Sequence, residues 1–176
     1  MTDRPVARTR DEALVYLDLN PCACGSVETE WDSGVVSVEG ALVKCYAGDC
    51  TTCGAAREYV FTLPRREVLP AGWPTFGGPE PSELLDAGEW MWLADLTAGN
   101  VPDDPEDARR ALSMARSAVE EVLKFIPEGQ DDVPDEAFWS VRGREVRAAE
   151  PPRFRRERLL VVRDTYLDLA GEARVR

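Results

Sequence analysis

The organisation of this chain is decided by two short segments, NPCACG at residues 20–25 and DCTTCG at residues 49–54. Each segment holds a pair of cysteines followed by a glycine, and the sequence between the pairs is strand-like. Two thiolate pairs on two tight turns supply the four soft ligands of a tetrahedral Zn²⁺. The glycine after each pair lets the backbone turn sharply, so that amide N–H groups point back at the sulfurs. We therefore predict one structural zinc, bound by Cys22, Cys24, Cys50 and Cys53.

A fifth cysteine, Cys45, leaves two hypotheses open. The single residue between Cys22 and Cys24 is a tighter spacing than the usual two. Cys45 is either a small buried hydrophobe on a strand that leads into the second pair, or it replaces Cys22 as a metal ligand. We expect a cytoplasmic protein without a signal or a membrane span, in which these thiols stay reduced rather than forming disulfides.

The order of elements around the cysteines resembles the zinc ribbon family. Strands are expected on both sides of a turn at Glu39-Gly40, and a last strand is expected to stop at Pro64. The expected strands are residues 27–31, 35–38, 41–46 and 57–63. The resemblance covers residues 20–63 only, and it implies one structural zinc on Cys22, Cys24, Cys50 and Cys53. It leaves the function open, because zinc ribbons serve nucleic-acid binding, protein docking and plain stabilisation.

The whole chain is predicted to have an α+β fold, with the zinc ribbon followed by a part with three helices. Residues 65–81 are rich in proline and glycine and contain Trp73 and Phe76, which indicates a linker that packs through its aromatic side chains. The predicted organisation is a disordered arm at 1–10, a ribbon at 11–64 that begins with an extended segment at 11–20, the linker at 65–81 and a helical domain at 82–171.

Three helices are predicted from their capping signals. Ser82 is expected to cap a helix that ends at Leu96. Asp104 and Pro105 begin the clearest helix, whose apolar residues recur at intervals of three and four up to Ile126. A last helix is expected at 154–170, closed by Gly171.

Composition limits the chemistry of the chain. None of its 176 residues is histidine, which excludes a Ser-His-Asp triad, a Cys-His pair and a zinc site with histidine ligands. Four thiolates also close the metal's coordination shell, whereas a catalytic zinc keeps a position open for water. The acidic groups at 103–107 and 131–136 are predicted to be solvated faces. We therefore expect no enzyme.

The net charge of −12 is distributed unevenly. Residues 141–158 hold seven arginines and three acidic residues, a local charge of +4, while residues 159–176 are balanced, so residues 1–140 carry −16. A body this acidic repels phosphate backbones and attracts basic surfaces. The arginines of 153–158 are expected to dock on the protein's own acidic surface or on a neighbouring chain.

These observations predict a protein-interaction module that meets a basic protein partner, as an immunity or antitoxin-like protein or a regulatory adaptor would. The aromatic run at Trp90 and Trp92 and the charged pair Asp131 and Asp132 are the predicted partner-binding residues. An alternative is a nucleic-acid-binding zinc ribbon regulator that uses the strip from Arg153 to Arg158. The sequence does not predict the oligomeric state.

Overall fold

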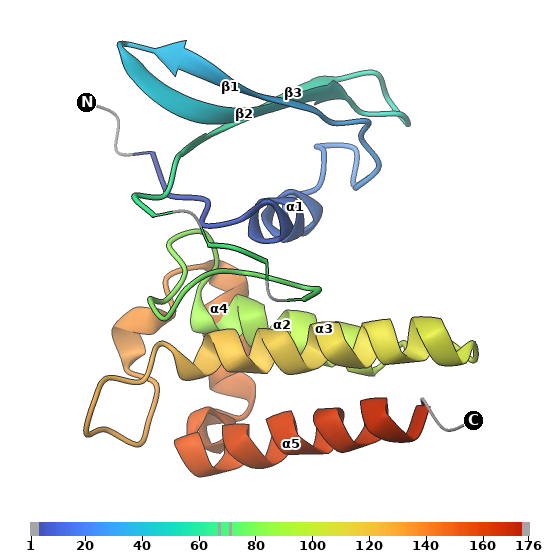
Figure 1. The fold of residues 1–176 in the computed structure, drawn as a ribbon, viewed down its shortest axis with the longest axis vertical. Helices are drawn as coiled ribbons and strands as arrows, with labels where there is room; N and C mark the ends of the chain where they lie inside the picture. The colour runs from blue at the N-terminus through green and yellow to red at the C-terminus, as the bar shows by residue number, and fades with distance from the viewer. Residues whose placement is uncertain (1–3, 67, 71, 174–176) are drawn as a thin grey trace. The chain divides into compact units, whose positions relative to one another are not determined.

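A computed structural model describes residues 4–66, 68–70 and 72–173. Its contacts divide the chain into two compact units, Met1–Leu69 and Pro70–Arg176. The first unit combines a helix with a sheet, and the second is helical (Figure 1). The chain is therefore α+β, with more helices than the three that the sequence predicts. The division between the units falls within the segment 65–81 that the sequence predicts as a linker.

The sheet of the first unit is a three-stranded antiparallel meander. Its strands are β1 (Asp32–Val38), β2 (Ala41–Asp49) and β3 (Ala56–Thr62), in the order β1-β2-β3. The turn between β1 and β2 is made by Glu39 and Gly40, both with positive φ (52° and 83°), which is the backbone conformation that a tight hairpin requires. The hairpin predicted there is confirmed. The strand predicted at 27–31 is wrong, because this segment forms only an isolated bridge from Thr29 to Cys50.

The extended segment predicted at 11–20 is a helix, α1 (Arg10–Leu19). Its N-cap is Thr9, whose hydroxyl accepts a hydrogen bond from the N–H of Glu12. Tyr16 packs edge-on against Tyr59 and Phe61 of β3, so α1 covers one face of the sheet. Residues 13–19 are apolar except Asp18, which is also compatible with a helix that is buried on several sides, and the structure forms that helix.

The arm predicted as disordered at residues 1–10 is structured from Arg4 onward. Val6 forms a parallel bridge to Thr62, and the N–H of Thr62 donates to the carbonyl of Pro5 at 3.0 Å. The buried Glu12 carboxylate accepts hydrogen bonds from the backbone N–H and from the guanidinium of Arg8. Residues 1–3 of the predicted arm lie outside the described residues.

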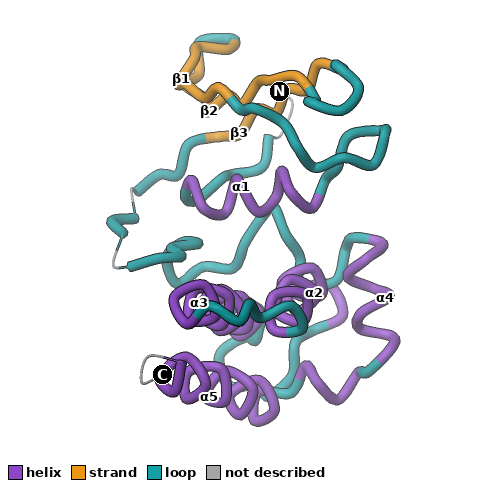
Figure 2. Tube along the Cα trace, turned by 90° about the vertical axis from the view of Figure 1, so that its right-hand side faces the viewer, coloured by secondary structure: helices purple, strands orange, loops and turns teal. Residues whose placement is uncertain are grey.

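The second unit contains α2 (Ala87–Ala98), α3 (Pro105–Leu123), α4 (Val141–Ala149) and α5 (Arg156–Ala173), with short 3₁₀ helices at Asp135–Ala137 and Pro151–Phe154. Within this unit, α3 packs against both α2 and α5 (Figure 2). The start of α3 at Pro105 with Asp104 as its N-cap is confirmed.

Three other helix predictions need correction. The cap of α2 is Asp86 rather than Ser82, because Asp86 and Glu89 form a reciprocal capping box. The sequence predicts no helix between Ile126 and residue 154, where the structure has α4, capped by Ser140. Gly171 does not close the last helix, which continues to Ala173.

Glycine permits close packing between α2 and α4. A Cβ on Gly88 would lie only 2.4–2.8 Å from backbone atoms of Gly143. The buried Asp86 carboxylate holds the same junction, since it accepts from the N–H of Glu89 at 2.8 Å and from the N–H of Ser140 at 2.6 Å. Gly88 is therefore a packing requirement, and not only a weak point in the helix.

Within the described residues, no helix combines the length and the apolar character needed to cross a membrane.

Candidate metal centre

Four cysteine side chains of the first unit converge on one point. Their sulfur atoms all lie within 4.8 Å of one another, with Cys22 Sγ 3.6 Å from Cys53 Sγ and Cys24 Sγ 3.7 Å from Cys50 Sγ. A tetrahedral Zn²⁺ with bonds of about 2.3 Å requires sulfurs about 3.8 Å apart. The cluster therefore has the donor set and the dimensions of a four-thiolate metal centre.

The backbone around each pair forms a tight turn, which we call a knuckle: residues 22–25 close over three residues and residues 50–54 over four. The N–H of Gly25 donates to the Cys22 carbonyl at 2.7 Å, and the N–H of Gly54 donates to the Cys50 carbonyl at 2.8 Å. Both glycines have positive φ, 88° and 73°, a conformation that costs other residues free energy. The second knuckle follows directly on β2, and the first lies in the loop between α1 and β1.

The electrostatics of the cluster favour a cation. Backbone N–H groups of Cys53 and Thr52 lower the pKa of Cys50 to about 6. The N–H of Ala55 lowers the pKa of Cys53, but the neighbouring sulfurs of Cys24, Cys22 and Cys50 outweigh it and raise that pKa to about 12. Once one thiolate forms, its neighbours resist ionising, because like charges at this distance repel. A divalent cation removes this repulsion and allows all four sulfurs to ionise.

Arg57 of β3 connects the loop of the first knuckle to the sheet. It is 8% exposed, and its guanidinium donates to the carbonyl of Asn20 and, at 2.7 Å, to the hydroxyl of Thr29. The same group lies 4.8 Å from the ring centre of Trp31, within reach of a cation–π contact. Sequence reasoning missed this residue, whose only signal is a cation inside an otherwise β-forming segment.

Cys45 lies outside the cluster. It sits in the middle of β2, opposite Gly34 on one side and Val60 on the other, and is half-buried. Burial raises the pKa of its thiol. The structure therefore favours Cys22, rather than Cys45, as the partner of Cys24, Cys50 and Cys53.

The two predicted partner-binding tryptophans occupy different environments on α2. Trp90 is fully buried and its ring centre lies 4.7 Å from that of Phe76, so it belongs to the core of the second unit and is not accessible to a partner. Phe76 belongs to the predicted linker and packs as expected, whereas Trp73 is exposed. Trp92 is half-buried, with the guanidinium of Arg142 4.6 Å from its ring centre.

The two predicted partner-binding aspartates are exposed and lie beside the start of α5. Asp132 forms an ion pair of 3.7 Å with Arg155, and the carbonyl of Asp131 accepts from the N–H of Arg156 at 2.7 Å. Arg153, in the 3₁₀ helix that precedes α5, forms two hydrogen bonds with the carboxylate of Asp95. Of the arginine strip, Arg153 and Arg155 thus face the protein's own carboxylates, while Arg156 donates to the backbone carbonyl of Gln130.

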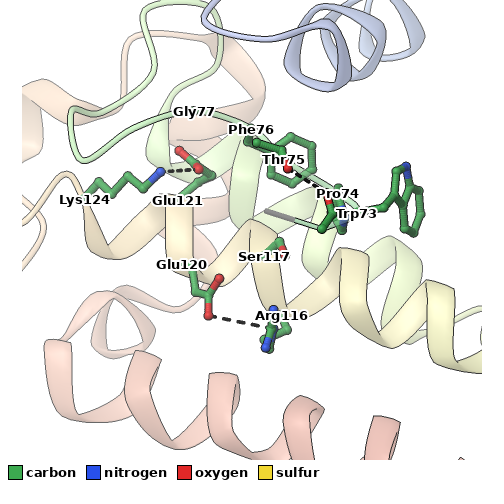
Figure 3. A pocket seen from close by; sticks show the side chains of 11 residues that line it. Trp73, Pro74, Thr75, Phe76, Gly77, Arg116, Ser117, Glu120, Glu121 and Lys124 are labelled. Carbon is green, nitrogen blue, oxygen red and sulfur yellow. Dashed lines mark hydrogen bonds and ion pairs between the residues drawn. The ribbon is translucent and has the colours of Figure 1, made fainter. Parts of the chain in front are cut away.

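A shallow pocket of about 270 Å³ in the second unit lies between residues 72–77 and α3 (Figure 3). Its two basic side chains already face carboxylates of the same helix: Lys124 pairs with Glu121, and Arg116 lies 3.8 Å from Glu120. This arrangement leaves no free charge to select a ligand, and we assign none to the pocket.

Fold and site together define an α+β protein with a four-cysteine centre suited to a metal ion. The chain matches no family of known proteins, no curated protein and no solved structure. The zinc ribbon resemblance of residues 20–63 therefore depends on the cysteines and the hairpin alone.

Proposed function

We propose that this chain is a non-enzymatic protein-interaction module, stabilised by one structural zinc and recognised through its acidic surface by a basic protein. The observation that carries the zinc assignment is the convergence of four sulfurs within 4.8 Å of one another, with two of the distances close to the tetrahedral value. Four protein ligands leave no position for a substrate or an activated water, which supports a structural rather than a catalytic metal. A cytoplasmic location belongs to the proposal, since reducing conditions keep the thiols available.

Charge supports the choice of a basic partner. The first unit has seven basic and eleven acidic residues, and the second has fourteen and twenty-two, so both units are acidic. Zinc on four thiolates would add two further negative charges to the total of −12. An acidic surface steers a basic protein toward productive encounter and repels nucleic acid. An immunity or antitoxin-like protein that masks the basic cleft of a nuclease would have these properties, as would a regulatory adaptor.

The alternative, a nucleic-acid-binding regulator that uses Arg153 to Arg158, is weaker because three of the strip's four arginines already have partners within the chain. Arg153 is held by Asp95, Arg155 faces Asp132, and Arg156 donates to the carbonyl of Gln130 at 3.1 Å. Binding a phosphate backbone would require breaking these contacts on a body that repels phosphate.

Capture of partners from the native cell, followed by mass spectrometry, tests the proposal when each candidate is then purified and titrated directly. We expect a basic protein whose affinity falls as salt rises, because screening weakens the attraction. Trp92→Ala is expected to weaken binding by about 2 kcal/mol without unfolding the chain. The double variant Asp131→Asn and Asp132→Asn should mainly slow association with the partner.

The matched control is the double variant Asp164→Asn and Asp168→Asn, since both aspartates are also exposed and lie on α5. Equal loss in both double variants would mean that net charge alone, rather than the Asp131–Asp132 site, drives recognition. A nucleic acid recovered in place of a protein would favour the alternative.

A further inference from the structure

The four cysteines of the metal centre differ in exposure in a regular way. Each knuckle contributes one buried and one exposed cysteine: Cys22 and Cys50 are 7% and 1% exposed, whereas Cys24 and Cys53 face solvent. The protein thus buries one cysteine of each knuckle and leaves the other exposed. A soluble reagent that attacks thiolates is therefore expected to reach Cys24 and Cys53 before Cys22 and Cys50.

Each exposed cysteine makes a sulfur–sulfur contact with the buried cysteine of the other knuckle. Cys53 Sγ lies 3.6 Å from the buried Cys22 Sγ, and Cys24 Sγ lies 3.7 Å from the buried Cys50 Sγ. Both contacts therefore join an exposed sulfur to a buried one across the site. A disulfide that joins two knuckles stabilises more than one within a knuckle, because it closes a longer loop.

From this arrangement we infer that the centre is a site of oxidative modification, at which hydrogen peroxide converts the four thiolates into two disulfides, Cys22–Cys53 and Cys24–Cys50. The inference rests on the metal centre proposed above. The exposed pair reacts first and the buried pair resolves, so the metal cross-link between the knuckles is replaced by a covalent one. Release of the metal accompanies the change, since disulfide sulfur is not a thiolate ligand.

Each disulfide forms in two balanced steps. The exposed thiolate attacks one peroxide oxygen, the O–O bond breaks and hydroxide leaves, which gives a sulfenic acid. The buried thiolate then attacks that sulfur, the S–O bond breaks and a second hydroxide leaves. Two protons from solvent convert both hydroxides to water, and the two sulfurs supply the two electrons that reduce the peroxide.

The competing product is the Cys50–Cys53 disulfide within the second knuckle, since two intervening residues are the usual spacing of redox-active pairs. Tryptic peptides separate the two outcomes. Cleavage after Arg10, Lys44 and Arg57 leaves the first pair on residues 11–44 and the second on 45–57. Disulfides across the site join the two peptides, whereas disulfides within a knuckle leave them separate.

The experiment treats the zinc-loaded full chain with hydrogen peroxide, follows released zinc with a chromogenic chelator, alkylates free thiols and maps the unreduced peptides by tandem mass spectrometry. We expect two disulfides for each zinc released, joined peptides, and alkylated Cys45. Cys45→Ser should give the same yield. Separate peptides, Cys22–Cys50 and Cys24–Cys53 pairing, sulfinic acids in place of disulfides, or zinc retained in excess peroxide would each overturn the inference. Zinc content before oxidation is measured on the same sample, so a chain without zinc identifies failure of the metal centre itself.

Discussion

At the residue scale, Arg57 contributes more to the first unit than its place on a strand suggests. Its guanidinium donates to Asn20 and Thr29 and faces Trp31, and all three precede or follow the first knuckle. We expect Arg57→Met to reduce the free energy of unfolding of this unit by about 3 kcal/mol, because charged hydrogen bonds and a cation–π contact are lost together. Zinc affinity, measured by competition with a chelator, should fall about tenfold or more.

The control for this prediction is Arg66→Met, since Arg66 is exposed. It should leave both the unfolding free energy and the zinc affinity within experimental error of the wild type. If Arg57→Met behaves in the same way, the guanidinium does not support the knuckle.

Glu89 makes the stability of the second unit depend on pH. Burial raises the pKa of its carboxyl above the ordinary 4.5, although the N–H of Asp86 partly offsets this effect. Because the folded state holds the proton more tightly than the unfolded state, the added stability is complete below pH 4.5 and is lost as pH rises through the raised pKa. Glu89→Gln should remove this dependence, so the variant gains stability relative to the wild type as pH rises.

Urea unfolding across mildly acidic to neutral pH checks this expectation, with tryptophan fluorescence as the signal, since four of the five tryptophans belong to the second unit. The exposed Glu136→Gln serves as the control. Parallel pH profiles for wild type and Glu89→Gln would show that this carboxyl is not the source.

At the element scale, the junction of α2 and α4 reverses the usual effect of glycine in a helix. Alanine is the better helix former by about 1 kcal/mol, but a methyl on Gly88 would meet the backbone of Gly143. We expect Gly88→Ala to destabilise the second unit by about 2 to 3 kcal/mol. At Gly171, inside α5, an added Cβ would meet no atom of the described residues within 4 Å other than its own helix backbone, so Gly171→Ala should be neutral or stabilising by up to about 1 kcal/mol. Chemical denaturation of both variants decides, and equal effects would show that the junction is looser than described.

The elements that could be predicted are those whose signals are local. Pro105 behind an Asp104 cap fixes the start of α3, and Glu39-Gly40 fixes the β1–β2 turn, because each depends only on neighbouring residues. The helix α1 was missed because its buried residues do not form one stripe. Thr9 and Glu12 were an available capping signal for it.

The same distinction holds for the candidate site. Four cysteines could be assigned from spacing and chemistry, since metal ligation demands few residue types. The burial of Trp90 could not be predicted in this way, because Trp90 packs against Phe76, which belongs to the predicted linker. Arg57 was missed for a related reason, since its partners Asn20 and Thr29 lie far away in sequence.

At the scale of the whole molecule, the net charge of −12 is expected to weaken the affinity for nucleic acid. We expect duplex DNA to bind no more tightly than tens of micromolar at physiological salt, because the acidic body opposes phosphate. Fluorescence anisotropy with a labelled duplex measures this. A salt-dependent submicromolar affinity that disappears when Arg155 and Arg156 are replaced by glutamate would reverse the ranking of the two proposed functions.

The account depends most directly on one metal ion held by Cys22, Cys24, Cys50 and Cys53. Native mass spectrometry of the wild type, Cys22→Ser, Cys45→Ser and Cys53→Ser, each purified with zinc present, measures the metal content of each chain. We expect one zinc in the wild type and in Cys45→Ser, and strongly reduced zinc with an unfolded first unit in Cys22→Ser and Cys53→Ser, because metal binding and folding are coupled here. Zinc that is lost with Cys45 and kept without Cys22, or a wild type that holds none, would contradict the assignment.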